Sequence, residues 1–293
     1  MSLRLEMLQV ARLAPSLLGE EASELVETFV RTQQHPKGGF CDREGQNPDL
    51  YYTVFALDTL TALQAALPQE TLRFLEQEEA TGEPDFVHLC SLARCLSCFP
   101  QRHGQVPEIL AEIEAFRSQD GGYSQTKEGM GSAYACFLAY GAYSDHGMDV
   151  PDAGGVVECL GSLFQKSGAW SNDAMIPVAN VPASAAAIAV LRNLGGLIPE
   201  ETVVAFMRGC FHAESGGFTP FQGAPLPDLL STAVALHALD GLQCPLEEIK
   251  DPCLDYLDTL WTAEGGFHGS WEDDVLDLEY TYYGLLALGH LAL

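Results

Sequence analysis

The sequence predicts an all-α protein in which six helix hairpins, about twelve helices, form a single α/α toroid over residues 1–293. Three observations lead to this prediction: a repeated unit, an alternation of apolar and polar helices, and an apolar final copy. The unit consists of a double glycine with an aromatic residue, a polar loop, and a helix rich in Ala and Leu. Its clearest copy, GGFHGSWEDDVLDLEYTYYGLLAL, begins at Gly265 and ends at Leu288.

The other copies support a helix-hairpin repeat. Four of them begin at Gly38, Gly121, Gly168 and Gly216, and a degenerate copy without the double glycine lies between the first two. One residue of each copy is assigned to the same repeat position: Thr53, His88, Ser132, Ser184, Thr232 and Thr281. Subtraction gives spacings of 35, 44, 52, 48 and 49 residues, which fit hairpins joined by loops of variable length.

Two kinds of helix alternate along the chain. Residues 3–13 and 20–33 form an amphipathic pair, and residues from Asp49 to about Leu63 form the first helix with little polar surface. The segment that begins near Pro68 is rich in charged and amide side chains. One helix of each hairpin is therefore expected to be buried in an inner ring, and the other to face water.

The end of the chain predicts that the array closes. An open array of repeats normally ends in a polar capping copy, but this chain ends in the apolar run LLALGHLAL. The final helix is therefore expected to pack against the first pair. A closed ring of this kind has a central cavity, and the loops before the inner helices form its functional rim.

Composition excludes several classes of partner. The chain has 14 basic and 41 acidic residues, and the net charge of −27 disfavours binding to nucleic acid or to an anionic membrane. No run of about 18 apolar residues predicts a membrane span, and the first residues lack the pattern of a signal peptide. We therefore expect a cytoplasmic protein.

The nine cysteines are expected to be reduced, buried thiols, because they are scattered through helical segments. Cys95 and Cys98, with His88 and Cys90 nearby, are the one group with the spacing of half a zinc site. No second cysteine pair completes that site. Buried thiols are therefore the favoured interpretation.

Three segments resemble a known family. They are QQHPKGGFCDREGQNPDLYYTVFALDTLTAL, PLPDLLSTAVALHALDGL and LDLEYTYYGLLALGHL. They are similar to the repeats of protein prenyltransferase β subunits, nearest to the type II (Rab) geranylgeranyltransferase β subunit, in the superfamily that includes squalene and terpene cyclases. The resemblance covers nearly the whole chain. It implies an isoprenoid ligand and a helical α-type partner subunit.

The same resemblance allows a test for the family's zinc site. Family members hold zinc with an Asp, a Cys two residues later and a His in the last repeat, and these positions fall on Asp228, Leu230 and Tyr280. Only Asp228 retains a family zinc ligand, so no zinc cofactor is expected. The residues that hold the diphosphate in the family are also missing. The loop GGFTPFQGAPLPD has no basic residue, and the position of a family His falls on Asn180. Both observations argue against standard thiol prenylation.

Acidic residues occupy the corresponding region instead. The candidate catalytic residues are Asp228, Asp274, Asp277, Glu279 and Tyr280. Crowded carboxylates raise each other's pKa, so one of them is a candidate general acid. The run from Glu272 to Asp274 partly resembles the Asp-rich motif of class II terpene cyclases. The alternative interpretation is that these acids cap a helix and form a solvated loop.

Aromatic residues of the inner helices and their loops are candidates for lining the cavity. The predicted substrate-binding residues are Tyr52, Phe55, Tyr134, Phe137, Trp170, Phe218, Trp271 and Tyr283. The alternative is that most of them pack one repeat against the next. Alanines within residues 183–189 are expected to leave room for a ligand.

Several functions fit the sequence. The favoured one is a prenyltransferase β-subunit-like protein that binds an isoprenoid or similar hydrophobic chain, with or without altered transfer chemistry. The second is a cyclase or isomerase that uses a carboxylic acid. The third is a glycosidase-like α/α barrel in which Asp228 and either Asp274 or Glu279 flank a sugar. A non-catalytic binding or interaction module is the fourth.

Overall fold

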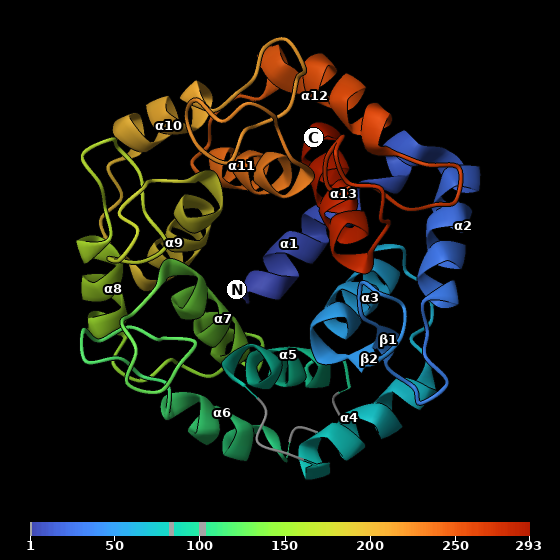
Figure 1. Ribbon diagram of the computed structural model, residues 1–293, viewed down its shortest axis with the longest axis horizontal. Helices are drawn as coiled ribbons and strands as arrows, with labels where there is room; N and C mark the ends of the chain where they lie inside the picture. Colours follow the sequence, from blue (N-terminus) through green and yellow to red (C-terminus); the bar gives the residue numbers. More distant parts are fainter. Residues whose placement is uncertain (1, 82–84, 100–103) are drawn as a thin grey trace.

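The computed structural model describes residues 2–81, 85–99 and 104–293, and in these ranges it contains an inner and an outer ring of helices (Figure 1). The inner ring consists of α3 (Leu50–Ala62), α5 (Phe86–Leu96), α7 (Ala133–Ser144), α9 (Val181–Leu194), α11 (Leu229–Gly241) and α13 (Leu278–Leu291). The outer ring consists of α2 (Pro15–Thr32), α4 (Gln69–Thr81), α6 (Val106–Glu114), α8 (Ala153–Ser162), α10 (Glu200–Gly209) and α12 (Glu247–Leu260). A short antiparallel pair, β1 (Phe40–Cys41) and β2 (Pro48–Asp49), precedes α3.

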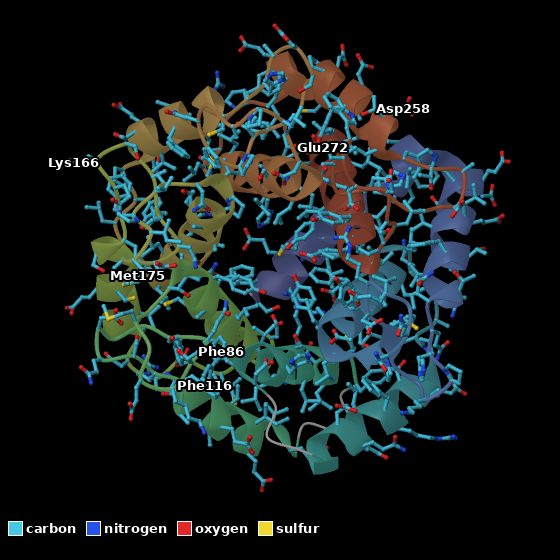
Figure 2. All side chains as sticks on the ribbon, viewed as in Figure 1. Phe86, Phe116, Lys166, Met175, Asp258 and Glu272 are labelled. Carbon is cyan, nitrogen blue, oxygen red and sulfur yellow. The ribbon has the colours of Figure 1, made fainter. Side chains whose placement is uncertain are left out.

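The inner ring is closed. Each inner helix packs against its two neighbours, and α13 packs against both α11 and α3. Each outer helix packs on the outside of the inner ring. For example, Phe86 at the start of α5 contacts Phe116, which follows α6, and their aromatic centroids are 5.3 Å apart (Figure 2). The predicted α/α toroid is confirmed. The first pair has different bounds from those expected, because α1 ends at Ala11 and α2 begins at Pro15, with a non-helical Gly19 inside it.

A hydrogen bond between a hydroxyl and a backbone amide repeats around the ring. The hydroxyl belongs to the fourth residue after the residue that caps an inner helix, and the amide belongs to the aromatic residue of the double-glycine turn. The pairs are Phe40 with Thr53 at 3.0 Å, Trp170 with Ser184 at 3.0 Å, Phe218 with Thr232 at 2.9 Å, and Phe267 with Thr281 at 3.4 Å. This bond fixes each turn to its own inner helix.

The repeat register predicted for two copies was wrong. Ser132 is itself the cap of α7, and His88 is the third residue after the cap Asp85. The positions equivalent to Thr53 are therefore Leu89 and Cys136. With these residues the spacings become 36, 47, 48, 48 and 49 by subtraction, which is a more regular repeat.

Neighbouring copies are joined at the start of the inner helices. The amide of the first helical residue donates to a carbonyl of the next copy's loop in three places: Ala133 to Asn172, Val181 to Pro220, and Leu229 to Gly269, each at 2.8 Å. At the seam between α13 and α3, side chains make the contact instead. These are Arg43 with Asp273 and Tyr51 with Glu279. The seam therefore gathers charged groups.

Helix α1 (Leu3–Ala11) belongs to neither ring, although the sequence prediction paired it with the next helix. It lies across the centre of the toroid, where it packs against α3, α7 and α13 (Figure 1). The buried Arg4 guanidinium donates to Asp58 of α3 at 2.5 Å, so an ion pair holds the helix in place. Helix α1 therefore forms the floor of the ring.

None of the described helices is long and apolar enough to cross a membrane. All nine cysteines are free thiols, as predicted, and six of them are buried; Cys41, Cys98 and Cys244 are only partly buried. Cys98 accepts a hydrogen bond from Arg4, and burial raises the pKa of Cys95. These two residues therefore belong to the packing beneath the ring.

Gly289 sets how closely the floor approaches α13. A Cβ atom at this position would lie 2.2 Å from the Val10 carbonyl oxygen of α1. We expect Gly289→Ala to lower the free energy of unfolding by about 1–3 kcal/mol, as for other overpacked sites. Gly161→Ala in α8 is the matched control, because its Cβ would meet nothing within 4 Å. Urea denaturation should show the control unchanged or slightly stabilised, and equal effects of the two substitutions would contradict the account.

Candidate functional site

The ring encloses a cavity with two adjoining lobes. The upper lobe has a volume of about 240 Å³ and the deep lobe about 50 Å³. Both are bounded by Met7, Tyr51, Tyr134, Phe137 and Tyr283. The remaining residues of the upper lobe are Pro182, Ala185, Ala186, Ala189, Leu230, Val234, His237 and Glu279. Those of the deep lobe are Leu3, Val54, Phe55, Cys90, Ser91, Arg94, Leu138, Gly141, Ala142 and Tyr282.

Four of the predicted aromatic residues line this cavity: Phe55, Tyr134, Phe137 and Tyr283. The alanines of α9 lie on the opposite wall, as the sequence predicted, and Ala185, Ala186 and Ala189 face the upper lobe. Small side chains on one wall and aromatic rings on the other leave an open, mainly apolar space.

The structure places the other predicted aromatic residues outside the two lobes. Trp170 and Phe218 are buried between the rings, where the Trp170 indole donates to the Leu160 carbonyl at 2.9 Å. Trp170 follows Gly168-Ala169 and Phe218 follows a double glycine, and the backbone amide of each aromatic residue donates a hydrogen bond to the inner helix, which leaves the ring on the outer side. Trp271 is half exposed and donates to Thr259 of α12 at 2.8 Å. Tyr52 packs edge-on against Tyr51, with centroids 5.5 Å apart.

Glu279 brings a carboxylate into the upper lobe. It lies in the first turn of α13, and its Oε1 accepts a hydrogen bond from the Tyr51 hydroxyl at 2.7 Å. Burial raises the pKa of Glu279 to about 7, while the hydrogen bond from Tyr51 lowers the pKa and Asp277 raises it further. Crowding of carboxylates was expected to cause such a shift, but burial is the main cause. Tyr51, which was not among the predicted site residues, is the direct partner of this acid.

Asp277 and Arg43 stand beside Glu279 at the mouth of the cavity. Asp277 caps α13 through a 2.8 Å bond from the Tyr280 amide, and burial raises its pKa to about 6. Arg43 comes from the loop between β1 and β2, pairs with Asp273, and lies 3.5 Å from Asp277. Its guanidinium also lies over the Tyr280 ring, 5.7 Å from the centroid. Sequence reasoning missed Arg43 because its partners are about 230 residues away along the chain.

The remaining predicted acids are engaged elsewhere or exposed. Asp228 caps α11, and its two oxygens accept from the Ser231 amide at 2.6 Å and the Ser231 hydroxyl at 2.8 Å. Asp274 is exposed in the loop before α13, as is Glu272 (Figure 2). The capping and solvated-loop interpretation therefore describes Asp228, Asp277, Asp274 and Glu272, but not Glu279.

The family's zinc position offers a poor set of donors. Leu230 is apolar and lines the upper lobe, and the Tyr280 ring lies beneath Arg43. The Asp228 carboxylate already accepts two bonds from Ser231. Among the residues described by the structure, no cluster of three or more His, Cys, Asp or Glu side chains has the arrangement of a metal site.

Two histidine contacts add polar groups near the cavity. His237 lines the upper lobe, and its Nδ1 lies 3.0 Å from Nε2 of the buried His290. Burial lowers the pKa of His237 to about 3, so this imidazole is neutral. His88 bridges the caps of α3 and α5, at 3.1 Å from Asp49 and 2.9 Å from Asp85. Those contacts raise the pKa of His88 to about 9.

The sequence matches the prenyltransferase alpha-alpha toroid domain over residues 16–82 and 184–292. The matched residues make up more than half of the chain. The protein belongs to the prenyltransferase α/α toroid family. No curated protein sequence matches it.

Solved structures of other toroids have the same fold at low sequence identity. An inactive variant of an α-1,6-mannanase of Salegentibacter sp., solved with α-1,6-mannotriose, is 13% identical with a TM-score of 0.62, covering 93% of this chain and 98% of the mannanase. A type II terpene cyclase from Scytonema is 11% identical with a TM-score of 0.62, covering 92% and 96%. Candida albicans protein geranylgeranyltransferase-I, complexed with GGPP, is 15% identical with a TM-score of 0.50, covering 97% and 83%. At these identities the likeness shows the fold alone.

The raised pKa of Glu279 predicts a pH-dependent stability for this toroid domain. The folded state holds this proton more tightly than the unfolded chain, whose glutamate pKa is about 4.5. The contribution of Glu279 to the free energy of unfolding is therefore fully present below pH 4.5 and is lost as the pH rises to about 7. We expect Glu279→Gln to stabilise the protein by about 2 kcal/mol more at pH 8 than at pH 5.

Urea denaturation of wild type and variant at the two pH values measures this difference. Asp274→Asn is the matched control, because it removes one negative charge from an exposed position of the loop that precedes α13. The control should keep the pH dependence of the wild type. An identical pH dependence in wild type and Glu279→Gln would show that Glu279 ionises as freely as in water.

Proposed function

We propose that this chain is a prenyltransferase β-subunit-like protein that binds an elongated isoprenoid or similar hydrophobic chain in its central cavity. The observation that carries the proposal is the lining of the upper lobe, where Ala185, Ala186 and Ala189 border the same space as the aromatic residues Tyr134 and Phe137. A helix that only filled a core would carry larger side chains, because empty volume costs about 24 cal/mol per Å³. The resemblance to type II geranylgeranyltransferase β subunits supports the same class of ligand.

Standard transfer to a thiol is not part of the proposal. A leaving diphosphate needs positive charge to stabilise it. Arg43 brings a cation to the mouth, but Asp273 and Asp277 already pair with it. The donors at Asp228, Leu230 and Tyr280 do not fit zinc. The proposed protein therefore binds the hydrophobic chain without the family's metal and diphosphate chemistry.

A second candidate function is acid-base catalysis by Glu279. The favouring observation is a carboxyl group inside an apolar lobe with a pKa of about 7 and a phenol partner at 2.7 Å. Such a group is suited to exchange a proton with an oxygen of the ligand near neutral pH. It is a weaker acid than an ordinary carboxylic acid, so it is poorly suited to protonate an alkene. The cyclase alternative is therefore limited to reactions at a polar group of the ligand.

The glycosidase alternative has less support. Glycosidases use two carboxylates on either side of the sugar. Among the described residues that line the two lobes, Glu279 supplies the single carboxylate. Asp274 is exposed and Asp228 caps a helix. The cavity walls are also mainly apolar, whereas a sugar needs many polar partners.

Titration with geraniol, farnesol and geranylgeraniol tests the proposal. Affinity should rise with chain length until the cavity is full, by at most about 0.8 kcal/mol per buried CH₂ group. Each diphosphate should bind no tighter than its alcohol, because Arg43, the cation at the mouth, is already paired with Asp273 and Asp277. A marked preference for the diphosphate that salt abolishes would show that transfer chemistry is present, and no binding of any chain would refute the isoprenoid proposal.

A cavity-filling variant locates the binding. Ala186→Phe places a ring in the upper lobe and should weaken the longer alcohols most. Ala111→Phe is the matched control, because Ala111 is exposed on α6. Equal affinities in the two variants would place the alcohols outside the cavity.

We also propose a docking partner at the mouth, in keeping with the helical α-type subunit that the resemblance implies. The loops before the inner helices expose several apolar residues, namely Met130, Met175, Ile176, Val178 and Phe221; Met175 is labelled in Figure 2. The net charge of −27 favours a partner with a basic face.

Purification from the protein's own cells at low salt, followed by native mass spectrometry and elemental analysis, tests the partner and the metal together. We expect a complex with a second chain and no stoichiometric zinc. Recovery of the free chain alone would contradict an obligate partner. One tight zinc that Asp228→Ala removes would contradict the metal-free site.

A further inference from the structure

The deep lobe contains two polar groups that the packing does not explain. Arg94 of α5 and Tyr282 of α13 both line it; Tyr282 is fully buried, and the Arg94 side chain is 16% exposed. The other walls are mainly apolar and include Leu3 and Met7 of the floor helix α1. Buried polar groups in a native protein normally have a hydrogen-bond partner, so each exception calls for an explanation.

Arg94 has a hydrogen-bond donor to spare. One terminal nitrogen donates to Asp58 Oδ2 at 2.9 Å, and Asp58 Oδ1 accepts from Arg4 at 2.5 Å. The Nε of Arg94 is buried and has no acceptor in the protein. Asp58 already accepts hydrogen bonds from the guanidinium groups of Arg4 and Arg94, and its single negative charge cannot balance both positive charges.

Tyr282 supplies a second donor. Its hydroxyl is fully buried and has no partner in the protein. Burial raises the pKa of this phenol, and the nearby Asp58 raises it further, so the hydroxyl keeps its proton. Arg94 and Tyr282 line the same lobe, on α5 and α13.

The charge around the deep lobe favours an anion. Two guanidinium groups, of Arg4 and Arg94, and two carboxyl groups, of Asp58 and Asp145, interact beside the deep lobe. Of these four groups, Arg94 is the one that lines the deep lobe, so the charged group at the lobe is a cation. Asp145 Oδ2 also lacks a partner, but Asp145 does not line the lobe. The surplus at the lobe itself is therefore two donors, one of them cationic.

We propose that the deep lobe binds the carboxylate of a hydrophobic acid, which accepts hydrogen bonds from Arg94 and Tyr282. This inference rests on the proposed function, and it narrows the ligand from a hydrophobic chain to a linear isoprenoid or similar acid. The acid enters with its carboxylate first, and its hydrocarbon chain fills the upper lobe beside Glu279. A carboxylate fits because charge-assisted bonds to a guanidinium are the stronger ones.

Comparison of farnesoic acid with farnesol at pH 8 tests the proposal, because the acid is ionised in water there. The wild type should bind the acid about tenfold or more tightly than the alcohol, which corresponds to one charge-assisted hydrogen bond. Tyr282→Phe removes a hydroxyl without a protein partner, so the variant should fold. It should lose several-fold of the preference for the acid.

Tyr256→Phe is the matched control. Tyr256 of α12 also has a buried hydroxyl without a partner, but it lines neither lobe. This variant should keep the full preference for the acid. If the Arg94→Gln variant folds, it should have no preference for the acid. If it does not fold, the comparison of Tyr282→Phe with Tyr256→Phe tests the proposal.

The outcomes separate this inference from the proposed function. Equal binding of acid and alcohol by the wild type would overturn the carboxylate site and leave the hydrophobic cavity intact. An unchanged preference in Tyr282→Phe would overturn the assignment to the deep lobe. Binding of neither compound would overturn both proposals.

Discussion

Closure of the inner ring is the constraint on which the rest of this structure depends. Six similar hairpins make a toroid only if the last packs against the first, and here α13 meets α3. Three other joints use a backbone amide and a carbonyl of the next loop. The seam instead uses Arg43 with Asp273 and Tyr51 with Glu279. Closure therefore brings the first and last copies together and concentrates polar side chains at one side of the mouth.

The closed ring also determines the chemistry of those side chains. The space inside is mainly apolar, because aromatic side chains of α3, α7 and α13, alanines of α9 and the floor helix α1 line it. A carboxyl group that points into it loses water, which is why the pKa of Glu279 reaches about 7. The same desolvation acts on Asp277, where Arg43 opposes it. The cavity and the raised pKa of Glu279 are thus both consequences of ring closure. A ligand that fills the cavity is therefore expected to change the pKa of Glu279.

The fold could be predicted from the sequence because the same structural unit is repeated several times along the chain. Double glycines, apolar helices and a polar partner recur, and the errors of register fell on the copies where Leu89 and Cys136 replace the hydroxyl residue. The site was only partly readable. An inner helix is apolar on nearly every side, so its sequence does not show which face meets the cavity. Phe55 and Tyr283 line the cavity, whereas Trp170 lies on the outer side, where its backbone amide donates a hydrogen bond to Ser184. Arg43 and Tyr51 act on partners more than 220 residues away, and no local pattern reveals such contacts.

The link between cavity and acid can be measured by ¹³C NMR of the Glu279 carboxyl group during a pH titration, assigned by comparison with Glu279→Gln. The account predicts a pKa of about 7 in the free protein. Saturation with farnesol should raise that pKa further, because the bound chain displaces water from the upper lobe. A pKa near 4.5 that farnesol leaves unchanged would contradict the account, since it would mean that Glu279 faces water and not a hydrophobic binding site.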